Sequence, residues 1–489
     1  MMERIFTKGS AFVDEAGRTR IFNGANLCSK DFRKDNMSER TKFPMDLDDA
    51  FFATYVQNGF NVLRLGVCWD ELEHEMGKIN EPYLQSLDAI FAKAAQWGVY
   101  IFLDMHQDLY GSFDKEHCGN GAPKWAYLSE PYEPKPAKWI WPEGYFWGKA
   151  VHRAFDNFWA NKEVEGRGVQ DRYADLWRLL ARRCGESSAL LGYDVMNEPF
   201  PGSIGGKMFR KLILSIAKNV LFNKKLPAHK MLGDLLSKKR RGNLLNRLDG
   251  NVIPDITKAA NKLARQFGTE SFTPFLQRMT RAIRAETQHG VILFEHNYFG
   301  NIGVPLQIEP IAVDGKPEAS QGYSPHAYDF MVDTPGYVNA LDSRVQAFFD
   351  AARQSQLQMD VPVLVGEWGG GQEPMRHVQF LLDLFDRYGW SQAYYCYHYF
   401  SEEILRELNR TYPAAVTGEI KRYGFDRAAQ CFTLEYLQTE ATQAETVLYL
   451  HAPPKKVEAD GEVNQYSENG ADYLKIKTEP GEHRVAVYF

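Results

Sequence analysis

Short apolar runs alternate with longer amphipathic stretches over most of the chain. Apolar runs bounded by Gly or Pro are typical of buried parallel strands, whereas apolar residues every three or four positions predict helices. The alternation predicts an α/β fold with a parallel sheet, and eight strands close a (β/α)8 TIM barrel. The predicted strands are residues 20–28, 61–67, 100–106, 190–198, 290–297, 322–328, 361–368 and 391–399.

Helices are predicted between these strands, and two connections are too long for simple βα units. The helices cover residues 46–58, 81–97, 171–183, 280–288, 338–356 and 375–388. The connection over residues 107–170 is rich in Trp and Pro, and long connections of this kind usually form walls or lids of a site. The second long connection covers residues 199–275.

The second connection is strongly basic. Between residues 201 and 248 there are twelve Lys or Arg residues and one acidic residue, Asp234, interleaved with apolar residues. Two interpretations stay open: a solvated helical hairpin packed on the barrel, or an interfacial element that holds the barrel mouth against anionic lipid.

The pattern changes near residue 423. Short β-rich segments follow at 431–437, 446–450, 455–457, 472–477 and 483–488, separated by turn residues. They predict a small antiparallel sandwich. We therefore expect a barrel over residues 1–422, with a basic helical insertion near 200–275, and a C-terminal β-sandwich over residues 423–489.

Two predicted strands, the fourth and the seventh, end on a glutamate, Glu198 and Glu367. A (β/α)8 barrel keeps its catalytic groups at these strand ends, and glycoside hydrolysis requires a pair of carboxyls. A single buried Glu is more often a structural salt bridge, but two of them with Asn197 beside one favour catalysis. Because a nearby Arg64 would favour the ionised form of Glu367, we expect Glu367 to be the nucleophile and Glu198 the acid/base.

Other predicted strand ends also carry polar groups. Metal binding by Asp104 and His106 is the competing interpretation, and it is weak because no second cluster has ligand spacing. Glu295 and His296 after the fifth strand are a second candidate carboxylate site. No nucleotide-binding or nucleophile-elbow motif follows a strand, so neither metal nor cofactor is expected.

Taken together, these motifs resemble the retaining glycoside hydrolases of clan A, family 5. Within that family the chain resembles the endoglycoceramidases and their endogalactosylceramidase relatives, through residues 119–126, the basic insertion and residues 411–418. The resemblance covers nearly the whole chain. The motifs are Asn197-Glu198-Pro199, Gly366-Glu367-Trp368, Arg64, the run from Asp104 to Asp108, and His326-Ala327-Tyr328.

The resemblance implies roles for individual residues. Glu198 takes the acid/base role, Glu367 the nucleophile role, and Asn197 the contact to the sugar 2-hydroxyl, while Tyr328 resembles the tyrosine that hydrogen-bonds the nucleophile. The chain departs from the family pattern at Tyr395, where a tryptophan is expected, and this favours galactose-linked ceramide. The substrate-binding residues are expected to be Lys30, Arg64, Asp104, His106, Asn197, His326, Tyr328 and Tyr395.

The function expected from the resemblance is that of a retaining endo-β-glycosidase, which cuts between the intact glycan and the ceramide of glycosphingolipids. Peripheral contact with a membrane or micelle surface is part of this expectation. One alternative is an endoglucanase or exo-β-glucosidase acting on soluble glycans. Another is a non-catalytic glycolipid-binding protein, although a binder gains nothing from two close carboxylates that repel each other.

The composition adds limits to this picture. The net charge of −6 gives no reason to expect nucleic acid as a partner. No apolar stretch is long enough to span a bilayer, and the N-terminus lacks the apolar region of a signal peptide. We expect a monomer that is cytoplasmic, or secreted after removal of a leader. The six cysteines have no metal-like spacing, which favours buried thiols.

Overall fold

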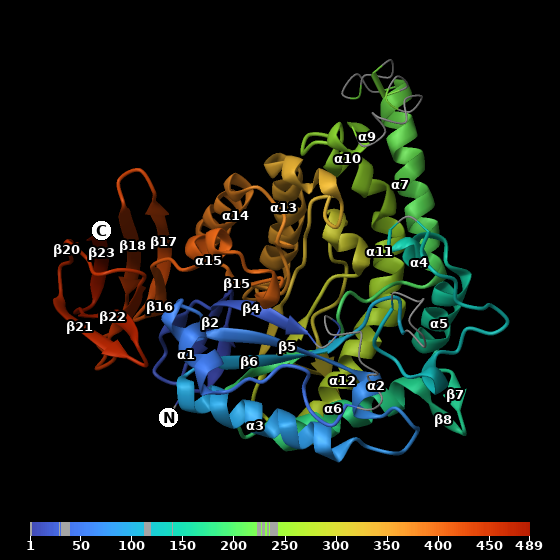
Figure 1. Ribbon diagram of the computed structural model, residues 1–489, viewed down its shortest axis with the longest axis horizontal. Helices are drawn as coiled ribbons and strands as arrows, with labels where there is room; N and C mark the ends of the chain where they lie inside the picture. The colour runs from blue at the N-terminus through green and yellow to red at the C-terminus, as the bar shows by residue number, and fades with distance from the viewer. Residues whose placement is uncertain are drawn as a thin grey trace.

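The computed structural model describes residues 2–28, 30, 40–111, 119–138, 140–222, 226, 230, 231, 234 and 243–489. A barrel of eight parallel strands occupies its centre, helices surround the barrel, and a β-domain lies at one side (Figure 1). The predicted (β/α)8 barrel with a C-terminal β-domain is therefore confirmed. Neighbouring barrel strands follow chain order, and β15 returns to pair with β4. The barrel strands are β4 (Asn23–Cys28), β5 (Val62–Cys68), β6 (Tyr100–His106), β9 (Leu190–Asp194), β10 (Val291–Phe294), β13 (Gln321–Tyr323), β14 (Leu364–Val365) and β15 (Ser391–Tyr394).

The barrel closes between β13 and β14. Two parallel bridges join these strands, Tyr323 to Val363 and His326 to Glu367. The second bridge brings a candidate catalytic residue beside a candidate binding residue. The predicted strands 190–198 and 361–368 are shorter in the structure, so Glu198 and Glu367 lie in the segments that follow β9 and β14.

An apolar layer fills the barrel near the N-terminal ends of its strands. Its members are buried and come from successive strands, so the barrel interior is a packed core rather than a channel. This layer leaves the C-terminal ends of the strands for polar groups. It includes Phe22, Val62, Tyr100, Phe102, Leu191, Val291, Leu293, Leu364 and Ala393.

The helices of the barrel have local start and stop signals. α3 covers Glu81–Trp97 as predicted, because Asn80 caps its first turn and Gly98, with φ +75°, ends it. α12 begins earlier than predicted, with a proline in its first turn. The other helices are α1 (Asp49–Gln57), α2 (Trp69–Leu72), α4 (Glu143–Trp147), α5 (Lys149–Trp159), α6 (Val169–Cys184), α7 (Ser203–Phe222), α9 (Asn243–Asn246), α10 (Ile253–Thr257), α11 (Asn261–Phe267), α12 (Thr273–Arg284), α13 (Asp342–Met359), α14 (Met375–Tyr388) and α15 (Glu402–Leu408).

The basic insertion begins as one long helix. α7 rises along the right side of the molecule and its end projects beyond the other elements (Figure 1). Within the described residues, no helix is both long and apolar enough to cross a membrane. The basic run Lys238–Arg241 lies outside the described residues, as does Cys118, while the other five cysteines are buried.

The β-domain is larger than predicted and includes both ends of the chain. Its seven-stranded sheet has the order β1-β2-β3-β16-β19-β22-β21, and a four-stranded sheet has the order β17-β18-β23-β20. The predicted boundary at residue 423 falls inside β17, so the domain begins near β16. β16 was missed because it pairs with the distant β3 and β19. The strands are β1 (Ile5–Lys8), β2 (Ala11–Asp14), β3 (Thr19–Arg20), β16 (Tyr412–Val416), β17 (Glu419–Asp426), β18 (Cys431–Gln438), β19 (Thr446–Leu450), β20 (Lys456–Glu458), β21 (Glu462–Glu468), β22 (Ala471–Lys477) and β23 (Gly481–Tyr488).

Candidate active site

A buried arginine, Arg64 on β5, organises the polar end of the barrel. Its side chain is 1% exposed, and four carboxyl groups surround the guanidinium. Burial disfavours its charge, but these carboxylates raise the pKa of Arg64 well above its ordinary value. The distances from its nitrogens are 2.6 Å to Glu367, 2.8 Å to Glu295, 2.9 Å to Asp194, 3.2 Å to Asp104, and 3.0 Å to the amide oxygens of Asn26 and Asn197.

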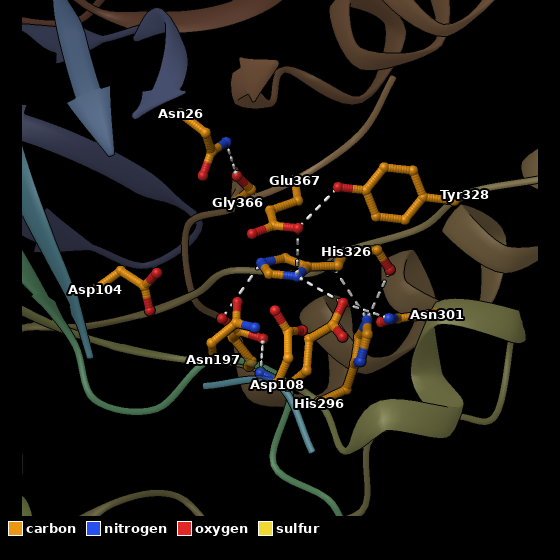
Figure 2. A network of polar contacts seen from close by, with 12 residues as sticks. Asn26, Asp104, Asp108, Asn197, His296, Asn301, His326, Tyr328, Gly366 and Glu367 are labelled. Carbon is orange, nitrogen blue, oxygen red and sulfur yellow. Dashed lines mark hydrogen bonds and ion pairs between the residues drawn. The ribbon is translucent and has the colours of Figure 1, made fainter. Parts of the chain in front are cut away.

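Glu198 and Glu367 face each other across this end of the barrel. One carboxylate oxygen of each lies within 4.8 Å of the other. His326 stands between them, with Nδ1 3.2 Å from Glu198 Oε1 and 3.8 Å from Glu367 Oε2. Figure 2 shows His326 directly below Glu367 and Tyr328 approaching the same carboxylate from the side. The two glutamates predicted from separate strand ends are thus brought together.

The two glutamates have different surroundings. Arg64 Nη1 donates to one oxygen of Glu367 at 2.6 Å, and the Tyr328 hydroxyl donates to the other at 2.7 Å. The first of these is a charge-assisted bond, and together they occupy both oxygens of Glu367. Burial raises the pKa of Glu198, and the nearby Asp108 raises it further. Paired carboxyls in such different environments can divide the roles of nucleophile and proton donor.

The rise in the pKa of Glu198 is opposed first by the charge of Lys30 and then by a hydrogen bond from Asn301. Its Nδ2 donates to Glu198 Oε1 at 2.5 Å, and a hydrogen bond to the charged form lowers the carboxyl pKa. Asn301 lies in the 3-10 helix η6 (Tyr298–Ile302), which follows β10. η6 thus brings the Asn301 side chain to the Glu198 carboxylate from the segment that follows β10.

The predicted first-sugar residues also converge here. His106 Nδ1 lies 2.5 Å from Asp104 Oδ2, and both residues are buried. Lys30 Nζ donates to Asp108 Oδ2 at 3.0 Å and lies 4.8 Å from the ring centroid of Tyr395. Every predicted site residue therefore belongs to one polar cluster, although its role in binding stays a prediction.

A cavity of about 470 Å³ opens over this cluster. Its polar lining includes Lys30, Asp108, Glu198, Tyr328, Glu367 and Tyr395. The same cavity also has a large apolar lining. Its apolar lining consists of Ile140, Trp141, Pro142, Phe146, Leu245, Ile302, Phe330 and Val332.

Among the described residues, two groups of side chains have ligand atoms close enough for a metal ion. They are Asp194, Glu295 and His326, and Glu198, His326 and Glu367. Each group has at least one carboxylate paired with the Arg64 guanidinium, at 2.8 Å for Glu295 and 2.6 Å for Glu367. A metal ion would therefore compete with a buried positive charge.

Sequence reasoning missed three residues of this site and ranked a fourth too low. Asp194 is the last residue of β9 and its one charged residue, a signal that could have been used. Asn26 lies inside β4 and donates to the carbonyl of Gly366 at 2.7 Å. Asn301 has no strand signal at all. Glu295 was only a second candidate, yet it lies at the centre of the cluster.

The chain belongs to glycosyl hydrolase family 5. The family model described as "Cellulase (glycosyl hydrolase family 5)" matches residues 24–222 and 241–401, and the "Glycoside hydrolase family 5 C-terminal domain" matches residues 410–487. The protein is therefore a glycoside hydrolase with a barrel and the C-terminal β-domain of this family, as the sequence motifs indicated.

Its relatives include glycolipid hydrolases. Endoglycoceramidase I of Rhodococcus hoagii is 25% identical over 478 residues, which cover 93% of this chain and 82% of that protein. The structure of endo-glycoceramidase II from a Rhodococcus species, in complex with ganglioside GM3, aligns with a TM-score of 0.72 at 22% identity, covering 98% of this chain and 99% of that one. The structure of an endogalactoceramidase aligns with a TM-score of 0.67 at 19% identity, covering 99% of this chain and 100% of that one.

The Asn301 contact predicts a shift in the pH dependence of hydrolysis. Replacing Asn301 with Ala removes a bond that favours charged Glu198, so the pKa of Glu198 rises. If Glu198 must be protonated to act, the alkaline limb of kcat/KM on an aryl glycoside moves to higher pH. Asn464→Ala, at an exposed position on β21, is the control and should leave the profile unchanged. A shift to lower pH would contradict this account of the site.

Proposed function

We propose that the protein is a retaining endo-β-glycosidase that releases the intact glycan from the ceramide of glycosphingolipids. The observation that carries this proposal is that one cavity is lined both by the carboxyl pair and by a large set of apolar side chains. A soluble glycan would leave these apolar side chains in contact with water. A lipid aglycone would cover them, and burying apolar surface is favourable by about 25 cal/mol per Å². The names of the curated relatives support the same substrate class.

The proposed mechanism is double displacement. Glu367 attacks the anomeric carbon while Glu198 gives its proton to the ceramide oxygen, and the C–O bond to ceramide breaks as the glycosyl–Glu367 ester forms. Glu198 then takes a proton from water, which attacks the same carbon and frees Glu367. One carboxylate oxygen of Glu198 and one of Glu367 lie within 4.8 Å of each other. This distance supports double displacement, since inverting enzymes keep their carboxyls about 6.5–9.5 Å apart.

A galactose at the first sugar position is the proposed preference. Tyr395 lines the polar end of the cavity, and Lys30 Nζ lies over its ring. A tyrosine covers less of a sugar face than tryptophan does, and it adds a hydroxyl that can bond a sugar oxygen. Galactose differs from glucose in its axial 4-hydroxyl. A site built to bond that hydroxyl would reject the epimer, because its own polar group would be left unpaired.

Contact with a lipid surface is proposed through α7. The helix has four basic residues and no acidic one, and exposed apolar residues are interleaved with them. Leu214, Leu221 and Phe222 are 68%, 70% and 80% exposed. The helix is joined to the cavity, because Phe209 stacks on Phe146 of the apolar lining with 4.5 Å between ring centroids. α7 thus presents basic and apolar side chains next to the apolar lining of the cavity, a combination that fits an anionic membrane surface.

The carboxyl pair is tested by single substitutions. Glu198→Gln and Glu367→Gln should each lower kcat by at least about 10³-fold, because each removes one half of the double displacement. The folded fraction, measured by circular dichroism, should not change. Azide should restore turnover in Glu367→Gly and give an α-glycosyl azide. Activity close to that of the wild type in either Gln variant, or a product with inverted configuration by NMR, would refute the mechanism.

The sugar preference is tested with paired substrates. Wild-type protein should release glycan from galactose-linked ceramide with a higher kcat/KM than from glucose-linked ceramide. Tyr395→Trp should shift that ratio toward glucose, whereas Tyr395→Phe separates the loss of the hydroxyl from the change of ring. Thin-layer analysis of the products measures both. Equal rates of the wild-type protein on the two ceramides would show that the preference is wrong.

The lipid contact is tested by vesicle binding. Each basic residue near an anionic surface contributes about 1 kcal/mol. Lys211→Glu combined with Lys218→Glu should therefore weaken binding to phosphatidylserine vesicles by about tenfold or more, and added salt should reduce the difference. Turnover of ceramide substrate in vesicles should fall, while hydrolysis of a soluble aryl glycoside stays the same. Lys477→Glu on the β-domain is the control. Unchanged vesicle binding would leave α7 as a packing element only.

A further inference from the structure

Glu295 is a third carboxyl in the active site that the double displacement does not use. It follows β10 and is 1% exposed. One of its oxygens contacts the main chain of Glu198 and the other contacts Arg64, which also bonds Glu367. We propose that Glu295 is a positioning residue that fixes the main chain of the acid/base Glu198 and ties it to the nucleophile through Arg64. This inference rests on the proposed roles of Glu198 and Glu367.

The first observation is the bond from Glu295 to the main chain of Glu198. Glu295 Oε2 accepts the N–H of Glu198 at 2.7 Å. Glu198 has φ +42°, in the left-handed region that residues other than glycine seldom adopt. The next polar group of this main chain, the Glu198 carbonyl, accepts from Gln107 Nε2 at 3.2 Å. Side chains therefore hold both sides of Glu198 in a conformation that the strand alone would not impose.

The second observation is the link to the nucleophile. Glu295 Oε1 accepts from Arg64 Nη2 at 2.8 Å, and Nη1 of the same guanidinium donates to Glu367 at 2.6 Å. A planar guanidinium fixes the directions of its bonds. His326 also lies beside both carboxyls, with Nε2 3.3 Å from Glu295 Oε1 and Nδ1 3.2 Å from Glu198 Oε1. The spacing of the catalytic pair thus depends on a residue that touches neither substrate nor reacting atoms.

The chemistry of Glu295 cannot be replaced by an amide of the same shape. Its two oxygens each face a donor, Arg64 on one side and the Glu198 N–H on the other. A carboxyl group, charged or protonated, keeps a lone pair on each oxygen, whereas the nitrogen of a glutamine amide has none to offer. In Glu295→Gln an NH₂ group must therefore face one of these donors. One of the two links is lost while the size of the side chain is kept.

The test compares substrates that need a proton with substrates that do not. Aryl glycosides with a poor leaving group, such as 4-methoxyphenol, depend on Glu198 as an acid. In 2,4-dinitrophenyl glycosides the dinitrophenolate leaves without receiving a proton. Glu295→Gln should lower kcat/KM at least tenfold for the first and less than threefold for the second. For the dinitrophenyl glycoside, kcat should also fall and recover in azide, because hydrolysis of the intermediate needs Glu198 as a base.

Two further variants make the result decisive. Glu198→Ala must show the same dependence on leaving group, and its absence would refute the proposed acid role rather than this inference. Asp194→Asn alters a carboxyl that bonds Arg64 without changing the bond to the Glu198 N–H. It should therefore lower kcat/KM by the same factor for both substrates.

An equal loss on both substrates in Glu295→Gln, alongside leaving-group dependence in Glu198→Ala, would overturn the positioning role. If Glu295→Gln does not fold, Glu295→Asp replaces it. Aspartate keeps both acceptor oxygens on an arm shorter by one methylene. Glu295→Asp is then expected to lower kcat/KM more for the 4-methoxyphenyl glycoside than for the dinitrophenyl glycoside, with a smaller difference than in Glu295→Gln. Equal losses on the two substrates would again overturn the inference.

Discussion

The buried charge of Arg64 is the constraint on which the rest of the active site depends. An uncompensated guanidinium inside a barrel would cost at least several kcal/mol, so the strands around it must supply acceptors. Four carboxyls and two amide oxygens do so. One positive charge cannot keep four neighbouring carboxylates ionised. Burial accordingly raises the pKa of Asp194 to about 7, even though Arg64 lowers it, and burial with Asp194 raises that of Glu295 well above its ordinary value. Arg64 together with His106 lowers the pKa of Asp104, although burial opposes this. The shortest contact of the guanidinium is to Glu367.

The fold could be predicted from the sequence wherever its signals are local. The apolar run of β6 and the helices α3 and α14 were predicted to the residue, because burial pattern and end signals lie in the same segment. β16 was missed because its partners β3 and β19 lie far away in the sequence. The first strands, β1 to β3, were missed although they pair with each other locally, because each has only two to four residues. The boundary near residue 423 was misplaced because β17 has mostly exposed or half-exposed residues and no apolar run.

The site could be predicted to the same extent and for the same reason. Most site residues at the ends of barrel strands were found, because the fold brings all such ends to one edge, but Asp194 at the end of β9 was missed. Asn301 could not be found, since its contact with Glu198 arises from a turn of 3-10 helix seven residues beyond the strand. The importance of Glu295 was hidden as well. Its bonds run to a main-chain N–H and to a side chain on another strand, and neither leaves a trace in the local sequence.

The polar and the apolar lining of the cavity come from different parts of the barrel. The polar lining needs buried charges in fixed directions, and the strands supply these through Arg64 and its neighbours. The apolar lining comes from connections outside the strands, including the segment before α4 and the residues after β13. Connections can change their surface without disturbing the barrel, because the barrel core lies near the other ends of the strands. The carboxyl pair is therefore positioned by the strands, whereas most of the apolar lining comes from the connections between them. Phe209 of α7 stacks on Phe146 of the apolar lining, so the helix proposed to contact lipid packs directly against the cavity wall.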